Sequence, residues 1–578
     1  MEKIIRRRTN CGTSLPVLPV HPLLSRVYHA RGIDSPEDLD LGLSRLIDPS
    51  QLLNGGRAAT LLADAIAANL KMLIVGDFDA DGATSTALAL SALRQLGAAH
   101  VSYLVPNRFE YGYGLTPEIV ELALGEQPDI IITVDNGISS LDGVAAASAA
   151  GIVTVITDHH LAGSELPDAS VIVNPNQPGC PFPSKNLAGV GVIFYLMMAL
   201  RSELRCRAWF ESQGLKEPNL AQFLDLVALG TVADVVPLDR NNRVLVAAGL
   251  KRIRAGRARA GIVALLEMAS RDPLSTVASD LGFAVAPRLN AAGRLDDMSI
   301  GIECLMCDEK STAASYALQL DRLNKDRRII ENEMQQDALV ALKGLQFEDT
   351  EPLPVALTLY QPDWHQGVIG ILASRVKDRI HRPVIAFANG SDNQIKGSAR
   401  SIAGIHIRDM LDAVATRHPG LISKFGGHAM AAGLSLAQAD YADFSSAFVE
   451  EVGRHVEAGD MEAVIYTDGE LEDRDYDLQV ANELRFGGPW GQHFPEPLFD
   501  GRFTLVQQRL VGEKHLKLTV TPVNSTRLID AIAFNVDLDR WPDESVEIVN
   551  LAYRLDINEF RGNTNLQLVV EYLSADGH

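Results

Sequence analysis

Residues 71–86, KMLIVGDFDADGATST, contain the pattern that decides the fold. A short apolar run is followed by three carboxylates at alternate positions, Asp77, Asp79 and Asp81. The apolar run is typical of a buried strand. Alternate residues of an extended segment point the same way, so at least two of the carboxylates should converge, and such close like charges repel unless a cation lies between them. The stretch therefore predicts a metal site at the end of a strand.

The spacing excludes a calcium-binding loop of the EF-hand type. Counted from Asp77, the sixth residue is the required Gly82, but the twelfth is Leu88 and not the bidentate Glu. Thr84 and Ser85 follow Gly82 and are expected to cap a helix.

The same pattern of an apolar run ending at an acid occurs twice more. The run 129–134 ends at Asp135, and the run 152–157 ends at Asp158, which His159 and His160 follow. Helical stretches, expected at 83–95, 117–124 and 140–150, separate the strands. This order predicts a parallel sheet with right-handed crossovers, whose strands end at one shared edge where open α/β folds bind ligands. The acids and both histidines could therefore meet in space.

A further acid, Asp234, interrupts the apolar segment 230–238, GTVADVVPL, after an apolar helical stretch at 223–229. Burial of a lone carboxylate is costly. Asp234 is therefore either a hydrogen-bonded cap or a further carboxylate ligand of the same site, and the residues alone leave both interpretations open.

Together these motifs resemble a known family. DFDADG at 77–82, VDNG at 134–137, DHH at 158–160 and GTVADVVPL are similar, in order and distance, to the DHH phosphoesterase superfamily. Within it they resemble the bacterial exonucleases that degrade single-stranded DNA in the 5′→3′ direction. Four motifs of the second half resemble that family's connecting region and its DHHA1 domain: NAAGR at 290–294, WHQGVIG at 364–370, GSARS at 397–401 and GGHA at 426–429. The resemblance covers nearly the whole chain.

The resemblance implies metal-dependent phosphodiester hydrolysis of single-stranded DNA, in repair and recombination. Two ions, Mn²⁺ or Mg²⁺, are expected on six ligands: Asp77, Asp79, Asp81, Asp135, His159 and Asp234. Asp135 is the best candidate for a bridging ligand, and imidazole favours Mn²⁺ without excluding Mg²⁺. His160 is expected near the scissile phosphate, with Asp158 orienting the histidines.

Substrate binding is expected from residues outside the metal site. Ser398 and Arg400 are two residues apart, therefore on one face of a strand, and suit a phosphate. By resemblance they receive the 5′ phosphate together with Arg288 or Arg294, and Arg108 is a further basic candidate. For His365 and His428, structural and binding roles remain open.

The net charge of −22 opposes long-range attraction of a polyanion. Binding to DNA would therefore depend on local basic surfaces, including the run 251–259, KRIRAGRAR, for which a solvated helix face is the alternative.

The expected fold class is α/β with an additional all-β module. The expected domains are an N-terminal segment packing on the first sheet at 1–70, a parallel-sheet DHH domain at 71–300, a long connecting helix at 301–350, a smaller α/β DHHA1 domain at 351–462, and an OB-fold at 463–578. Alternation of Leu516, Leu518 and Val520 with polar residues indicates the β-module. Tyr553, Arg554, Phe560 and Arg561 are candidates for a stacking surface there, with burial of the aromatic residues as the alternative.

The length and the cysteines limit the class of protein. With 578 residues and 47% hydrophobic content the chain can form several cores, and no stretch approaches the roughly 20 apolar residues of a membrane span. The basic N-terminus lacks the apolar core of a signal peptide. The five cysteines show no disulfide framework, and a metal or redox role for Cys304 and Cys307 is disfavoured. These features indicate a cytoplasmic protein, expected to be monomeric, and the resemblance suggests a single-strand-binding protein and a RecQ-type helicase as partners.

Two alternative functions use the same motifs. Phosphoesterases that act on oligoribonucleotides or cyclic dinucleotides are shorter chains without the β-module. Non-catalytic replication scaffolds of the superfamily have lost metal ligands, whereas every acidic motif is intact here. Both features favour the exonuclease.

Overall fold

The computed structural model describes residues 3–8, 17–107, 111, 114–344, 354–391, 393–457, 459–523, 525–538, 540–560 and 562–576. The chain forms two compact units. The larger unit comprises Arg8–Asn324 and Asp468–His578, and the smaller comprises Met1–Arg7 and Lys325–Thr467.

The larger unit contains the parallel sheet that the sequence predicts. Its strand order is β3-β2-β4-β5-β6, and every pairing is parallel. The bounds are β2 Met72–Gly76, β3 Val101–Leu104, β4 Ile130–Val134, β5 Val153–Thr157 and β6 Val171–Val173. The direction of strand order reverses between β2 and β4, so the ends of these two strands form the switch point where open α/β sheets bind ligands.

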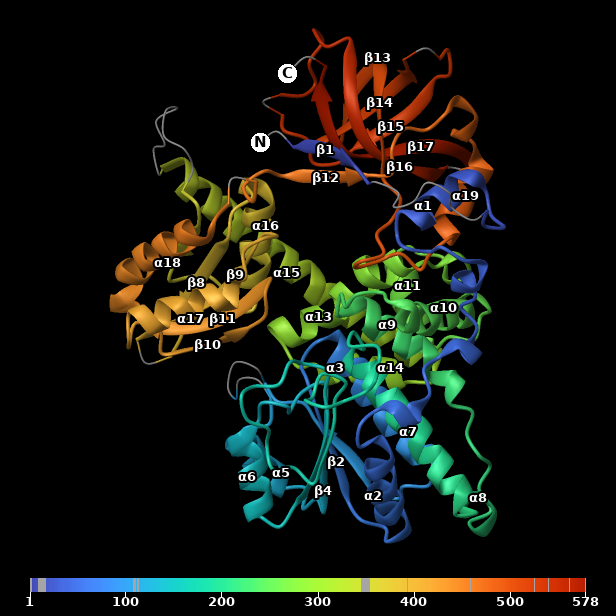
Figure 1. Ribbon diagram of the computed structural model, residues 1–578, viewed down its shortest axis with the longest axis vertical. Coiled ribbons are helices and arrows are strands. Elements are labelled where there is room, and N and C mark those ends of the chain that lie inside the picture. Colours follow the sequence, from blue (N-terminus) through green and yellow to red (C-terminus); the bar gives the residue numbers. More distant parts are fainter. Residues whose placement is uncertain are drawn as a thin grey trace. The chain divides into compact units, whose positions relative to one another are not determined.

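Helices cover both faces of this sheet (Figure 1). α5 (Pro117–Leu124) and α6 (Leu141–Ala149) pack on one face. The other face carries α2 (Gly55–Ala67), α3 (Ala80–Gln95) and α7 (Gly189–Cys206). These elements fix the strand ends in a rigid frame.

The predicted capping of α3 is wrong. The helix begins at Ala80, and Asp79 is its N-cap. Thr84 and Ser85 are fully buried within the helix because a tighter turn after β2 starts it earlier than the sequence pattern suggested.

Further helices continue the larger unit. In chain order they are α1 Pro22–His29, α8 Trp209–Ser212, α9 Leu224–Ala233, α10 Arg240–Arg254, α11 Ala260–Met268, α12 Ala278–Asp280, α13 Ala286–Leu295, α14 Ser299–Met306 and α19 Leu478–Phe486. A π-helical turn at Leu281–Val285 leads into α13.

The predicted β-module is a closed five-stranded barrel with strand order β13-β14-β15-β17-β16. Its strands are β13 Phe499–Val511, β14 His515–Pro522, β15 Ile529–Ala533, β16 Ile548–Phe560 and β17 Asn563–Ala575. Leu516, Leu518 and Val520 are buried on the inner face of β14, as the alternation predicts. The barrel belongs to the same compact unit as the parallel sheet.

The predicted long helix is α15 (Lys310–Gly344), one continuous helix and not a two-helix hairpin. It begins in the larger unit and continues in the smaller one.

The smaller unit contains a mixed sheet of order β10-β11-β9-β8-β7. Its strands are β7 Leu357–Tyr360, β8 Val384–Asn389, β9 Gln394–Arg400, β10 Lys424–Gly427 and β11 Ala431–Ala437, and its helices are α16 Ile369–Ile380, α17 Ile407–Arg417 and α18 Tyr441–His455. β1 (Ile4–Arg7) pairs in parallel with β12 (Val464–Thr467) in this unit. Gly426 and Gly427 pair with β11 within β10.

No helix in the described part of the chain is long and apolar enough to cross a membrane.

Candidate metal centre

The loop after β2 carries Asp77 and Asp79 at the switch point of the sheet. Asp79 Oδ1 accepts hydrogen bonds from the backbone N–H groups of Asp81 (2.9 Å) and Gly82 (3.0 Å), so one of its oxygens caps α3. Asn290 Oδ1 on α13 accepts from the N–H of Ala80 at 2.8 Å. The loop is therefore fixed both by its own helix and by a distant one.

Asp135 follows β4 and faces the same edge. Its backbone has φ 63°, a left-handed conformation that turns the chain sharply where the strand ends. Its side chain is almost fully buried, and ligand atoms of Asp77, Asp79 and Asp135 all lie within 4.8 Å of one another. The first predicted cluster of carboxylates is thus formed.

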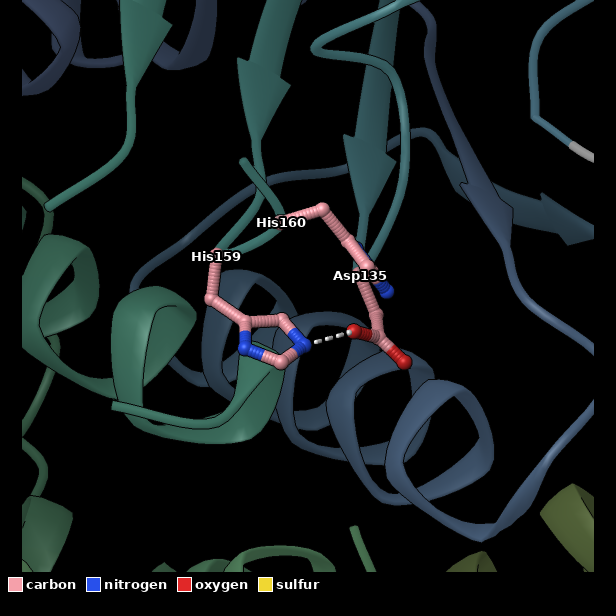
Figure 2. A group of neighbouring side chains, drawn as sticks. All are labelled: Asp135, His159 and His160. Atoms are coloured by element: carbon pink, nitrogen blue, oxygen red, sulfur yellow. Dashed lines mark ion pairs between the residues drawn. The ribbon is translucent and has the colours of Figure 1, made fainter. Parts of the chain in front are cut away.

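His159 and His160 follow β5 and extend this cluster. His159 Nε2 faces Asp135 Oδ1 at 3.1 Å (Figure 2). Asp158 Oδ1 lies 2.7 Å from His160 Nδ1 and also accepts from the backbone N–H of His159, while its Oδ2 accepts from Ile138 N–H. Asp158 therefore contacts the backbone of both histidines and the ring of His160.

Asp81 and Asp234 form a second group with His159. One ligand atom from each of the three lies within 4.8 Å of the others, and His159 Nε2 is 3.4 Å from Asp234 Oδ2. Asp234 is the residue at the C-terminal end of α9. Both oxygens of Asp81 accept backbone hydrogen bonds at the start of α7, from Gly189 (2.6 Å) and Val190 (3.0 Å).

Gly189 shows how closely α7 approaches the acids. A Cβ placed on it would lie 2.6 Å from Asp135 Oδ1, closer than real contacts allow. Only glycine lets the start of α7 reach both Asp81 and Asp135. Neither Gly189 nor the hydrogen-bonding role of Asn290 is predicted from the sequence pattern, although GVG at 189–191 directly opens an apolar helix.

The electrostatics of the cluster are unfavourable without a cation. Burial, followed by the charges of Asp81 and its neighbours, raises the pKa of Asp135 well above its ordinary value. Burial and Asp234 raise the pKa of Asp81 to about 7, and burial and Asp79 raise that of Asp234 to about 8. Burial lowers the pKa of His159, which favours the neutral imidazole that ligates metals. Its buried Nε2 makes no hydrogen bond within the described residues. Several oxygen donors and one available imidazole nitrogen fit divalent cations such as Mn²⁺ or Mg²⁺.

All six predicted ligands thus belong to overlapping groups of possible metal ligands, and His160 joins one of them with Asp135 and His159. Arg108 lies outside the described residues.

In the smaller unit, Ser398 and Arg400 lie together on β9. Arg400 Nη1 donates to Ser398 Oγ at 3.1 Å, which agrees with the expectation that both lie on one face of a strand. A Cβ on Gly370 would lie 2.9 Å from both side chains, so the first turn of α16 abuts them. We call Ser398, Arg400 and the start of α16 at Gly370 the Ser398–Arg400 site. A hydroxyl, a guanidinium and a helix N-terminus at one point suit an anion.

The remaining predicted substrate residues differ in their surroundings. Arg288 forms an ion pair with buried Asp321 (Nη2 to Oδ1, 2.8 Å) and donates to Ala284 O, which anchors α13 on α15. Arg294 is half-buried in the last turn of α13. His365 Nδ1 accepts from Gly367 N–H before α16, and the N–H of His428 donates to Ala431 O in the β10–β11 turn.

The stacking surface proposed for the barrel is not formed by Tyr553 and Arg554. Tyr553 is fully buried and its hydroxyl bonds that of Tyr476 at 2.8 Å, because its side chain points into the barrel. Arg554 is paired with Glu496 and Glu571. The side chain of Phe560 and residue Arg561 lie outside the described part of the chain.

Family models match three parts of the chain. The DHH family N-terminal domain matches residues 71–231, the DHHA1 domain matches 354–454, and the RecJ OB domain matches 467–572. The single-stranded-DNA-specific exonuclease RecJ of Dickeya dadantii is 56% identical over 98% of this chain and 98% of its own length. The chain belongs to the RecJ family.

Other RecJ proteins support this assignment. RecJ of Escherichia coli is 53% identical over 98% of both chains. The crystal structure of RecJ from Thermus thermophilus in complex with Mn²⁺ matches with a TM-score of 0.77 at 30% identity, over 97% of this chain and 76% of that one. The same RecJ has also been solved in complex with Mg²⁺.

Proposed function

We propose that this protein is a metal-dependent exonuclease that degrades single-stranded DNA in the 5′→3′ direction. The observation that carries the proposal is the convergence of five aspartates and His159 at the switch point of a sheet, in a chain that is RecJ-like over its whole length. The nucleotide products would leave one at a time from the 5′ end.

Asp77, Asp79, Asp81, Asp135, His159 and Asp234 would hold two divalent cations, Mn²⁺ or Mg²⁺, with Asp135 between them. Asp135 suits this position because it belongs to groups with both Asp77–Asp79 and His159–His160. Bound divalent cations would supply Lewis-acid neutralisation of the charge that develops on the scissile phosphate. The buried frame around the carboxylates keeps them in place before substrate arrives.

His160 would contact the scissile phosphate, and Asp158 would hold it there. Asp158 is ionised, so its 2.7 Å contact requires a proton on His160 Nδ1, and Nε2 is the ring nitrogen that would reach the phosphate. Burial opposes protonation of His160, but the charge and hydrogen bond of Asp158 raise its pKa to about 9. Asp158 is a positioning residue in this scheme, since it makes its contacts to the two histidines and to Ile138.

The 5′→3′ polarity would come from the Ser398–Arg400 site, which would receive the terminal 5′ phosphate. Arg400 offers planar donors and Ser398 offers a hydroxyl, and no side chain among the described residues caps the N-terminus of α16. A phosphate bound there would be a fixed starting point for the strand. Arg288 is a weaker candidate for binding the 5′ phosphate than the sequence suggested, because its guanidinium already pairs with Asp321.

The small-substrate phosphoesterase remains the weaker alternative. The barrel and α15 extend this chain well beyond a minimal two-domain phosphoesterase, and the RecJ OB domain model covers the barrel. Loss of metal ligands, the mark of a non-catalytic scaffold, is not found among the described motifs.

Location and partners follow from family resemblance and from the substrate. We propose a cytoplasmic, monomeric enzyme, consistent with four free thiols among the described cysteines. A single-strand-binding protein and a RecQ-type helicase are the proposed protein partners.

The test is digestion of 5′-labelled and 3′-labelled single strands, with duplex DNA, oligoribonucleotides, a cyclic dinucleotide and pyrophosphate as competing substrates, in Mn²⁺, Mg²⁺ or EDTA. We expect early release of the 5′ label from single strands and no reaction in EDTA. Early release of the 3′ label, or hydrolysis of the small substrates alone, would reject the proposal.

A further inference from the structure

A cluster of basic side chains lies in the larger unit, and it includes none of the proposed metal ligands. A small cavity of about 50 Å³ opens where the C-terminal end of α10, the start of α12 and the end of α19 meet. Arg254, Arg485, Phe486 and Trp490 are among its lining residues, and none of the proposed metal ligands is. Its volume suits one phosphate group or a group of similar size.

Two guanidinium groups converge on one aromatic ring at this cavity. Arg254 Cζ lies 4.9 Å and Arg485 Cζ lies 5.7 Å from the ring centroid of Phe486. Arg254 is also fixed by a 2.7 Å hydrogen bond from Nε to the carbonyl of Thr276. Phe486 is 37% exposed, so part of its side chain is accessible to a ligand. We call Arg254, Arg485 and Phe486 the Arg–Phe–Arg cluster.

No acidic side chain in the described part of the chain forms an ion pair with either arginine. Glu496 lines the cavity but is bound by Arg554, and the nearby Asp280 pairs with Arg271. Burial, followed by the neighbouring charge of Arg485, lowers the pKa of Arg254. The charge of Asp280 offsets part of this lowering. Two adjacent cations without a direct ion pair among the described residues still favour binding of an anion.

The surroundings favour a polyanion over a single carboxylate. Lys251 and Arg257 are exposed, continue the cationic surface around the end of α10, and form no ion pair with a described residue. By contrast, Arg252 and Arg259 of the same run face the buried Asp225. The run 251–259 is therefore neither wholly a solvated helix face nor wholly a binding surface. Cationic side chains beside a partly exposed aromatic ring are the groups that bind single-stranded nucleic acid through phosphates and base stacking.

We propose that the Arg–Phe–Arg cluster is a second contact for single-stranded DNA, in which the two arginines hold a phosphate and Phe486 contacts a base. The cluster makes long strands bind more tightly than strands too short to reach from the metal centre to it. The inference rests on the proposed function for its substrate, but it concerns binding of the strand and not the chemical step.

The test measures equilibrium binding of single strands from 4 to 40 nucleotides, in Ca²⁺ in place of a catalytic metal, across a series of salt concentrations. Arg485→Ala is expected to weaken binding of long strands roughly tenfold and to reduce the slope of log affinity against log salt by about 0.7. Phe486→Ala should weaken the same strands with little change of slope, because it removes stacking and not charge. Both variants should bind and cleave the shortest strands as the unsubstituted protein does.

Arg205→Ala is the matched control, because it removes the same charge as Arg485→Ala at another site. Arg205 is an exposed arginine on α7 that pairs with Glu217. It should change neither affinity nor slope. Melting temperatures identify any variant that fails to fold, in which case Arg485→Lys, which keeps the charge, should retain the slope but lose part of the affinity.

Unchanged binding of long strands by Arg485→Ala and Phe486→Ala would overturn the inference and assign the cavity to another anion, such as an acidic peptide. Equal weakening on strands of every length would overturn it too, because the cluster would then act at the metal centre. Failure of the proposed function gives a different result, namely no cleavage of the shortest strand by the unsubstituted protein in Mn²⁺.

Discussion

The metal centre and the Ser398–Arg400 site, which we propose to bind different phosphates of the strand, have opposite charge and opposite construction. The first gathers buried acids from the ends of β2, β4, β5 and α9, residues spread over more than 150 positions. The second takes two side chains from one strand and the first turn of the helix that packs beside it. The acid cluster concentrates negative charge and suits cations, whereas the Ser398–Arg400 site carries a positive charge and suits an anion. Loss of the metal centre should therefore remove the chemical step. Loss of the Ser398–Arg400 site should affect only the preference for 5′-phosphorylated over 5′-hydroxyl ends.

The largest effect is expected from Asp77→Asn. The change keeps the shape of the side chain but removes a charge from the group Asp77–Asp79–Asp135, so we expect cleavage of single-stranded DNA to fall about 10³-fold with little change in melting temperature. Asp81→Ala should be equally inactive but less stable, because Asp81 also accepts two backbone hydrogen bonds at the start of α7. Rates on 5′-labelled strands and thermal melts measure both. Activity of Asp77→Asn near that of the unsubstituted protein would mean that the cluster is not catalytic.

Arg288→Ala separates an arginine that holds the fold from one that binds substrate. Removing Arg288 leaves buried Asp321 without its cation, so the free energy of unfolding should fall by about 3 kcal/mol. The preference for 5′-phosphorylated over 5′-hydroxyl ends should stay the same. Arg474→Ala, at an exposed arginine paired with the exposed Glu472, is the control and should cost less than about 0.5 kcal/mol. Loss of end preference without loss of stability would return Arg288 to the substrate site.

Mn²⁺ should stabilise the protein through the metal centre and not through the Ser398–Arg400 site. Mn²⁺ at 100 times its dissociation constant should add about 2.7 kcal/mol to the stability of the unsubstituted protein, seen as a higher melting temperature. Asp135→Asn should lose most of this increase because it removes the carboxylate shared between ligand groups. Arg400→Ala should keep all of it. A similar increase in all three proteins would mean that Mn²⁺ binds elsewhere.

The metal centre could be predicted from the sequence because the topology of the sheet determines which strand ends lie together. Once Asp77, Asp135 and Asp158 each follow a strand of one parallel sheet, their convergence requires no knowledge of distances. It could not reveal that Asp79 rather than Thr84 caps α3, since that depends on the tight turn between β2 and the helix. Nor could it reveal Gly189, whose importance lies in contacts between segments more than 50 residues apart.

The arginines were harder to assign from the sequence for the same reason. Arg400 lies in a motif typical of the family and Arg288 lies two residues before another, yet Arg288 is paired with Asp321 and Arg400 contacts Ser398. A long cationic side chain is attracted equally by a buried acid and by a substrate phosphate, and only its neighbours in space distinguish the two. The same applies to Tyr553, whose position on the inner face of the barrel decides against stacking on a base.

The smallest effect is expected from Arg400→Ala. This substitution tests whether the Ser398–Arg400 site recognises the 5′ phosphate while the metal centre performs the chemical step. Removing a charge-assisted contact to a terminal phosphate should cost about 2 kcal/mol, or roughly a 30-fold lower kcat/KM on 5′-phosphorylated strands. Strands with a 5′ hydroxyl never make that contact, so their cleavage should change little. Arg408→Ala, an exposed arginine on α17 of the same unit, is the control. Equal losses on both kinds of end would show that Arg400 binds the strand as a whole and that polarity arises elsewhere.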